Sequence, residues 1–346
     1  MTLNRLNLLA TIFFILLLIT GIGFILVQNS KSHEKASHND NYSRNMSKIK
    51  VDNDLKEYGI EIISASDFNF DTELMRYIGD NEYVVSLVNS AKPFSLFVKN
   101  NSSKNIAGIS LRWEFKGSKK LFVEIPQSEA NPGVLMGIKP IDPKIVGKTS
   151  LISKKDVRFF TYFKDVVGSK VSSANMRHKN LFLNSSKIPD SNPLYISRLD
   201  SLKKNLLSQY SDFSVYIDGV FFEDGTFVGK DRNFFFDTLR GTVEARKDIL
   251  TDINSAKVSG KNNSDILDEI LDKTSNIFIY PLQSNKRDVT SEQVFDTSYN
   301  SYLKSLREEI LMKRSKLSDD SIVDQFQSVK ISDFATLRKV ETDNQQ

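Results

Sequence analysis

Residues 94–115 combine two apolar runs with a polar segment between them: FSLFVK at 94–99, NNSSKN at 100–105 and IAGISLRWEF at 106–115. The Asn and Ser side chains of the middle segment favour a turn because they hydrogen-bond to neighbouring backbone groups. In the last run apolar and polar residues alternate, which is typical of a strand with one buried face. The apolar set is Ile109, Leu111, Trp113 and Phe115, and the polar set is Ser110, Arg112 and Glu114. We therefore expect two strands, with Trp113 in the core and the polar set in water.

This order of strand, polar turn and tryptophan-bearing strand resembles strands B and C of immunoglobulin-like sandwiches, without the paired cysteines of antibody domains. Strand-like patterns dominate residues 60–163 and include further runs at 121–125, 134–138 and 157–163. Prolines mark loops between these runs, because proline cannot donate a backbone hydrogen bond to a sheet. The resemblance implies a β-rich, sandwich-like domain over residues 55–229.

Residues 213–229 predict a hairpin, since Asp224-Gly225 separates the apolar runs FSVYIDGVFF and FVG. The pattern resembles a DG…F.DG.F.G hairpin in uncharacterised exported bacterial proteins, a likeness that implies no activity and no site. Four acidic residues could in principle bind calcium or act as a carboxylate pair: Asp218, Glu223, Asp224 and Asp231. Aromatic residues occupy positions where a calcium loop needs oxygen ligands. The pattern therefore favours turn-forming acidic residues.

Residues 230–340 predict a mainly helical region, preceded by a short helix that carries apolar residues from 196 to 206. Apolar residues recur at helical spacing over 235–253 and 266–271, whereas NIFIYPL at 276–282 predicts a strand. Thr290 and Gln293 form a capping-box pattern at the start of a long helix, whose apolar side runs from Phe295 to Leu317. We expect this helix to pack on the β-rich part rather than to dimerise, and residues 341–346 to form a frayed tail.

Residues 8–27, LLATIFFILLLITGIGFILV, are uncharged and long enough to cross a bilayer as one helix. A cleavable signal peptide is the alternative, but this run exceeds the usual ~7–15 apolar residues and does not end in a small-residue cleavage site. Residues 1–7 form a short flank with Arg5, and residues 28–54 are a polar, flexible tether. We expect a single-pass anchor with the C-terminal domain outside the cytoplasm, because a large domain can translocate regardless of flanking charge. The fold class is then α+β: an N-terminal transmembrane helix, and an immunoglobulin-like antiparallel β-sandwich with C-terminal helices packed on it.

Composition excludes several chemistries. The chain has no cysteine, so disulfides and zinc ribbons are impossible. Two of its three histidines, His33 and His38, lie in the tether, which excludes a multi-histidine metal site in the body. His178, the only histidine beyond the tether, is expected in a solvated loop. A net charge of +4 without a basic block predicts no nucleic-acid partner. Gly147-Lys148-Thr149 lacks the glycine-rich cradle of a nucleotide site. The sequence thus predicts no catalytic, cofactor-binding or metal-ligating residue.

Three functions remain open. The first is a membrane-anchored extracytoplasmic binding or scaffold protein of the cell envelope, with an envelope protein as partner and an exposed apolar or aromatic patch as its signature. The second is a carboxylate-dependent envelope hydrolase that acts on glycan or peptidoglycan. It would need two acidic side chains in one concave pocket, at least one with a raised pKa. The third is an accessory subunit of an export or conjugation apparatus.

Overall fold

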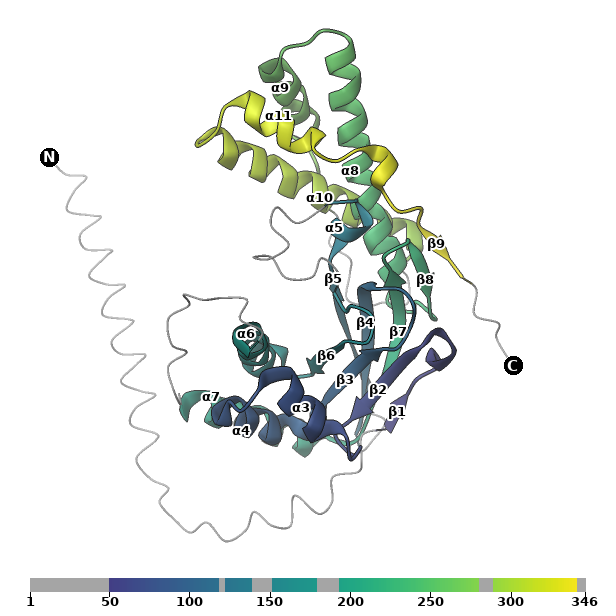
Figure 1. Cartoon of the computed structure of the whole chain (residues 1–346), viewed down its shortest axis with the longest axis vertical. Helices are drawn as coiled ribbons and strands as arrows, with labels where there is room; N and C mark the ends of the chain where they lie inside the picture. The colour runs from purple at the N-terminus through teal and green to yellow at the C-terminus, as the bar shows by residue number, and fades with distance from the viewer. Residues whose placement is uncertain (1–49, 118–121, 139–150, 179–192, 280–288, 341–346) are drawn as a thin grey trace, which may run out of the picture. The chain divides into compact units, whose positions relative to one another are not determined.

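The computed structural model describes residues 50–117, 122–138, 151–178, 193–279 and 289–340, all within one compact unit, Ser47–Gln346. The fold is α+β, with two β-sheets and a group of C-terminal helices (Figure 1). The predicted flank, apolar anchor, first part of the tether and frayed tail lie outside the described residues. Among the described residues, no helix is both long and apolar enough to span a bilayer.

Within the residues that the structure describes, the larger sheet contains six strands and the smaller one three. In the larger sheet the order is β5 (Phe122–Ala130), β4 (Ile106–Gly117), β7 (Tyr210–Phe222), β8 (Thr226–Val228) and β9 (Arg338–Lys339), and β1 (Lys50–Asp52) pairs in parallel with β7. In the smaller sheet the order is β2 (Ile60–Ser64), β3 (Ser95–Asn100) and β6 (Val157–Thr161). The tether prediction is therefore wrong at its C-terminal end, because β1 belongs to the sheet.

The two strands predicted at 94–115 are confirmed, but they lie in different sheets. Between β3 and β4, the Asn100 side chain accepts a hydrogen bond from Ser102 N at 3.1 Å and donates one to Lys104 O at 2.8 Å. These bonds fix the polar turn. The chain thus crosses from the smaller sheet to the larger one within a few residues.

The strand predicted at 106–115 is confirmed as β4, and Trp113 is buried in the core as predicted. The expectation that the opposite face is in water is wrong for Ser110 and Arg112, which are also buried. Ser128 donates to the Ser110 hydroxyl at 3.0 Å, and Arg112 pairs with Glu124. Both partners come from the neighbouring strand β5, so polar side chains on this face cover one another.

Helices replace strands at two predicted places. Residues 70–91 form α3 (Phe70–Ile78) and α4 (Glu82–Ala91) because their apolar residues recur every three or four positions and pack on the small sheet. Phe70 and Tyr77 of α3 contact the Phe97 ring of β3, with centroids 5.3 and 5.7 Å apart. The run at 134–138 is also not a strand, since Pro132 begins the short helix α5 (Pro132–Leu135).

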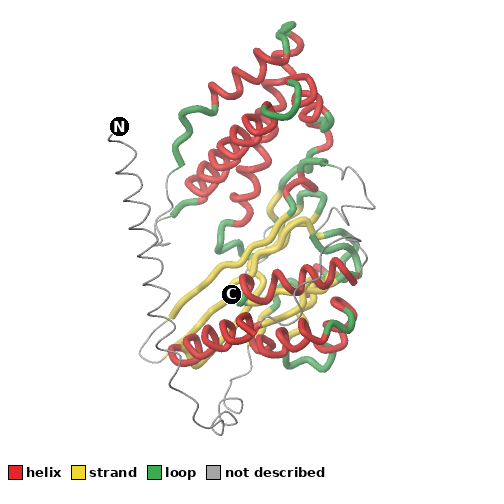
Figure 2. Tube along the Cα trace, turned by 90° about the vertical axis from the view of Figure 1, so that its left-hand side faces the viewer, coloured by secondary structure: helices red, strands yellow, loops and turns green. Residues whose placement is uncertain are grey.

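A π-helical turn and two helices follow the small sheet along the chain. This turn, η5 (Lys164–Gly168), follows β6 and leads into α6 (Ser169–His178), and α7 (Pro193–Gln209) is the predicted short helix. His178 therefore ends a helix rather than lying in the predicted loop. Figure 2 shows helices lying against one side of the strand layer and a second group of helices beyond its end.

The second group consists of α8 (Phe235–Val258), α9 (Asn263–Lys273), α10 (Ser291–Arg314) and α11 (Asp319–Gln327). The capping box of Thr290 and Gln293 is confirmed at the start of α10. Contrary to prediction, α10 packs mainly on α8. A Cβ on Gly241 of α8 would lie 2.5 Å from Phe295 O of α10, so glycine is needed for this close approach. The strand predicted at 276–282 is wrong for residues 276–279, which form no strand.

Candidate ligand-binding groove

The acidic residues of the hairpin stabilise loops rather than forming one site. Asp218 is buried and accepts backbone hydrogen bonds from Arg232 and Asn233 at 3.0 and 2.8 Å. Asp224 accepts one from Thr226 N at 3.0 Å inside the tight turn, where Gly225 has a φ of +83°. Glu223 accepts a hydrogen bond from the Asn105 side chain at 2.7 Å. The turn-forming role predicted for these residues is confirmed for Asp224, whereas Asp218, inside β7, and Glu223 bind segments distant in sequence.

Asp231 is the hairpin carboxyl with the most unusual surroundings. Burial raises its pKa, although the Lys339 ammonium at 2.9 Å and the Phe236 backbone N–H at 3.0 Å both favour the charged form. Its oxygen atoms therefore connect the start of α8 with the C-terminal strand β9. Within the described residues, no group of three or more His, Cys, Asp or Glu side chains could hold a metal ion.

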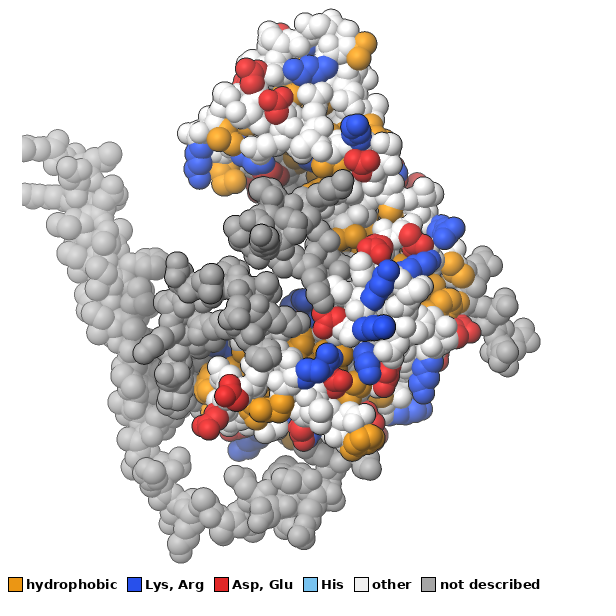
Figure 3. Space-filling view, in the orientation of Figure 1, with side chains coloured by type: hydrophobic (Ala, Val, Ile, Leu, Met, Phe, Trp, Pro, Cys, Tyr) orange, Lys and Arg blue, Asp and Glu red, His pale blue; other side chains and the backbone are white. Residues whose placement is uncertain are grey.

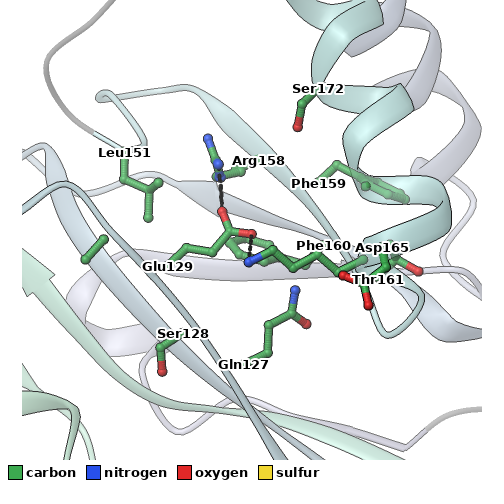
Figure 4. A pocket seen from close by; sticks show the side chains of 13 residues that line it. Gln127, Ser128, Glu129, Leu151, Arg158, Phe159, Phe160, Thr161, Asp165 and Ser172 are labelled. Atoms are coloured by element: carbon green, nitrogen blue, oxygen red, sulfur yellow. Dashed lines mark hydrogen bonds and ion pairs between the residues drawn. The ribbon is translucent and has the colours of Figure 1, made fainter. Parts of the chain in front are cut away.

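A cavity of about 660 Å³ lies where β5 of the large sheet faces β6 of the small sheet and η5. Glu129 of β5 projects into it (Figure 4) and accepts a hydrogen bond from Arg158 Nε at 2.7 Å, and Arg158 Nη2 forms an ion pair with the same Glu129 oxygen at 2.6 Å. The Lys164 ammonium of η5 is 3.7 Å from the other Glu129 oxygen. This ion-pair cluster connects the two sheets and fixes the width of the cavity at this point.

A second cavity of about 550 Å³ also reaches η5 and is lined by residues of β5 and α7. Its lining includes the aromatic rings of Tyr162 and Tyr210, the aliphatic side chains Leu202 and Leu206, and the amides of Asn205 and Gln209. Lys164 and Asp165 line both cavities. We name the two cavities together the η5 groove. Each is within the ~300–1,000 Å³ typical of small-molecule sites.

The groove is connected to the hydrophobic core through Trp113. The indole Nε1–H donates to Oε1 of Gln127 at 2.9 Å, and Gln127 lines the first cavity. The Trp113 ring also contacts Tyr162, with centroids 6.2 Å apart. Phe115 packs against both tyrosine rings of the second cavity, at 4.8 Å from Tyr162 and 5.7 Å from Tyr210. Packing therefore holds the groove's aromatic side chains in place.

The groove provides polar groups of both signs. Its cations are Arg158, Lys164 and Arg198, and its carboxylates are Glu129 and Asp165. A carboxylate-dependent hydrolase would need two carboxylates in one pocket, at least one of them with a raised pKa. Glu129 and Asp165 share a cavity here, whereas the carboxyl with the raised pKa is Asp231 of the hairpin. The chemistry of the groove is therefore suited to binding by hydrogen bonds and ion pairs.

Sequence reasoning identified none of these groove residues. They come mainly from β5, β6, η5, α6, α7 and the first residue of β7, which are separated along the chain by segments of very different length. One sequence feature could have indicated the site: aromatic and charged residues are dense over 158–165. Most of this run was interpreted only as the strand predicted at 157–163. On the face shown in Figure 3, Lys and Arg side chains are interspersed with Asp and Glu over the strands.

Comparison of the chain with protein-family models, curated proteins and solved structures gives no match.

Proposed function

We propose that this chain is a membrane-anchored extracytoplasmic protein of the cell envelope that binds a ligand or partner through its α+β body. Residues 8–27 would anchor it, and residues 28–49 would hold the body away from the bilayer. The immunoglobulin-like sandwich remains part of this proposal, supported by the crossing of the chain from one sheet to the other between β3 and β4.

The observation that carries the binding role is the η5 groove. Its walls come from two sheets and from the helical elements η5, α6 and α7, and the contact of Glu129 with Arg158 joins the two sheets. Preformed concave sites with a few convergent polar groups are typical of ligand binding. The π-helical turn in the middle of the groove is consistent with this role, because such turns are frequent at functional sites.

Membrane topology can be tested with one engineered cysteine, because the native chain has none. Val258 is 91% exposed at the end of α8, so a Val258→Cys variant offers an accessible thiol. We expect a membrane-impermeant maleimide to label this variant in intact cells, with the cysteine-free native chain as the blank. Labelling only after permeabilisation would place the body in the cytoplasm and refute the extracytoplasmic part of the proposal.

The partner class can be tested by gentle cross-linking and co-purification of the full chain from solubilised membranes. A variant lacking residues 1–30 serves as the control. Stoichiometric recovery of an envelope protein with the anchored chain would support a scaffold, and an export or conjugation apparatus among the recovered proteins would favour an accessory subunit. Recovery of background proteins alone would count against a protein partner.

A further inference from the structure

We infer that the η5 groove binds a short, uncharged segment of a glycan. This inference rests on the proposed binding role and names the ligand class of the same site. Three observations carry it: the polar groups near Lys164 and Asp165, which line both cavities, the other side chains that line the cavities, and the arrangement of the cavities.

Asp165, which lines both cavities, and Arg198, which lines the second cavity, are an acceptor and a donor without ion-pair partners in the described part of the chain. Both are exposed at the groove. Lys164, which also lines both cavities, is 3.7 Å from Glu129, beyond hydrogen-bond distance, and its side chain is 55% exposed. Within the described residues, one unpaired carboxylate, one unpaired guanidinium and one weakly paired ammonium are therefore available to a ligand.

Charge balance argues against a simple ion as the ligand. An anion drawn to Arg198 and Lys164 would also approach Asp165, and a cation drawn to Asp165 would approach both basic groups. A hydroxyl group avoids this conflict because it donates one hydrogen bond and accepts others. Vicinal hydroxyls of a sugar can satisfy carboxylate, guanidinium and ammonium groups together without bringing a charge into the site.

The remaining lining fits the same ligand class. Asn205 and Gln209 are four positions apart on α7, so their amides lie on one face of that helix and both line the second cavity. Tyr162 and Tyr210 add hydroxyl groups and aromatic carbon, which suits the mixed polar and C–H surface of a sugar ring. Two cavities that share Lys164 and Asp165 of η5 suit a ligand of several linked units.

Trp113 provides a built-in reporter for the test. It is the only tryptophan in the chain, and it contacts Gln127 of one cavity and Tyr162 of the other. We would titrate the full chain in lipid nanodiscs with chitotetraose or cellotetraose and record Trp113 emission, with isothermal calorimetry in parallel. Inorganic phosphate and tetra-alanine are the comparison probes for an anion and a peptide.

We expect a saturable change in Trp113 emission with at least one oligosaccharide and none with phosphate or tetra-alanine. Asp165→Asn and Arg198→Ala should each weaken binding about tenfold, the loss expected for one hydrogen bond to a charged group. Asp272→Asn, an exposed change on α9, is the matched control and should leave the affinity unchanged. Trp113→Phe should remove the fluorescence signal while calorimetry still detects binding.

The inference is overturned if neither oligosaccharide changes emission or releases heat, or if both groove variants bind as tightly as the native chain. It is also overturned if phosphate or tetra-alanine binds as tightly as the oligosaccharides. These outcomes do not depend on where the body resides. Failure here and failure of the maleimide experiment can therefore be told apart.

Discussion

Asp231 and Lys339 form an ion pair of 2.9 Å between residues 108 positions apart, and it ties the hairpin to the C-terminal strand. The Asp231 side chain is 1% exposed, whereas that of Lys339 is 42% exposed. The Lys339 ammonium therefore remains partly solvated, whereas the buried Asp231 carboxylate relies on this ion pair to stabilise its negative charge. Lys339→Met should cost about 2 kcal/mol of unfolding free energy at pH 7, less than for a fully buried pair.

The same pair predicts a pH dependence with a definite sign. Burial raises the folded-state pKa of Asp231 above its ordinary 3.8, so the folded protein holds this proton more tightly than the unfolded chain. Its contribution to stability is therefore greatest below pH 3.8 and is lost as pH rises through the raised pKa. Urea unfolding followed by Trp113 emission, on both sides of pH 3.8, measures this effect.

Asp231→Asn is the control for this titration. Asparagine tolerates the φ of +56° at this position and retains an acceptor for Phe236 N–H, but it cannot titrate. The difference in unfolding free energy between the native chain and this variant should therefore change across that pH range. A constant difference would show that Asp231 has the same pKa folded and unfolded.

Gly219 should be intolerant of a side chain. A Cβ there would lie 2.1 Å from Phe227 Cζ, a buried ring of the adjacent strand β8. We expect Gly219→Ala to cost about 2–3 kcal/mol through overpacking. At Gly168, by contrast, the nearest atom to an added Cβ is Lys164 Cγ at 3.5 Å, so Gly168→Ala is the control. Equal thermal stability of the two variants would show that Phe227 can move aside.

The capping box of α10 should be worth about 1 kcal/mol, the usual cost of removing an N-cap hydroxyl. Thr290 Oγ1 accepts a hydrogen bond from Gln293 N at 3.2 Å, and Gln293 Oε1 accepts one from Thr290 N at 3.0 Å. Thr290→Ala should lower the melting temperature and speed amide exchange in the first turn of α10. Thr290→Ser keeps the hydroxyl and should behave as the native chain; a loss in both variants would point to the methyl group instead.

Local signals explain which elements could be predicted from sequence. The tight turn at Asp224-Gly225 and the capping box at Thr290 are specified by residues a few positions apart, and both are confirmed. The strand pattern predicted over 60–163 does not hold for α3 and α4, because in α3 the buried residues Phe70, Leu74, Tyr77 and Ile78 recur at helical spacing.

The candidate site could not be predicted because its geometry is non-local. Glu129 and Arg158 meet only because β5 and β6 are edge strands of two different sheets, and nothing in either strand's sequence specifies that arrangement. The burial of Arg112 has a similar origin, since its partner Glu124 comes from the adjacent strand. Alternation predicted the face on which Arg112 lies, but not what covers that face.

Arg246 of α8 should stabilise the helical group through packing rather than through its charge. It is 8% exposed, its guanidinium lies 4.4 Å from the Phe326 ring centroid of α11, and Nη1 donates to the Tyr302 hydroxyl at 3.4 Å. Within the described residues it forms no ion pair, and its Nε is buried without a hydrogen-bond partner. A buried cation in this state carries a desolvation cost.

Two substitutions test this role of Arg246. Arg246→Met keeps a long side chain against Phe326 and removes the desolvation cost of the cation. Its unfolding free energy should therefore stay within about 1 kcal/mol of the native value. Arg246→Ala should lose about 2–3 kcal/mol because it leaves a cavity among the three helices. Chemical unfolding of both variants measures the difference, and an equal loss in the two would mean that the guanidinium group itself holds the helices together.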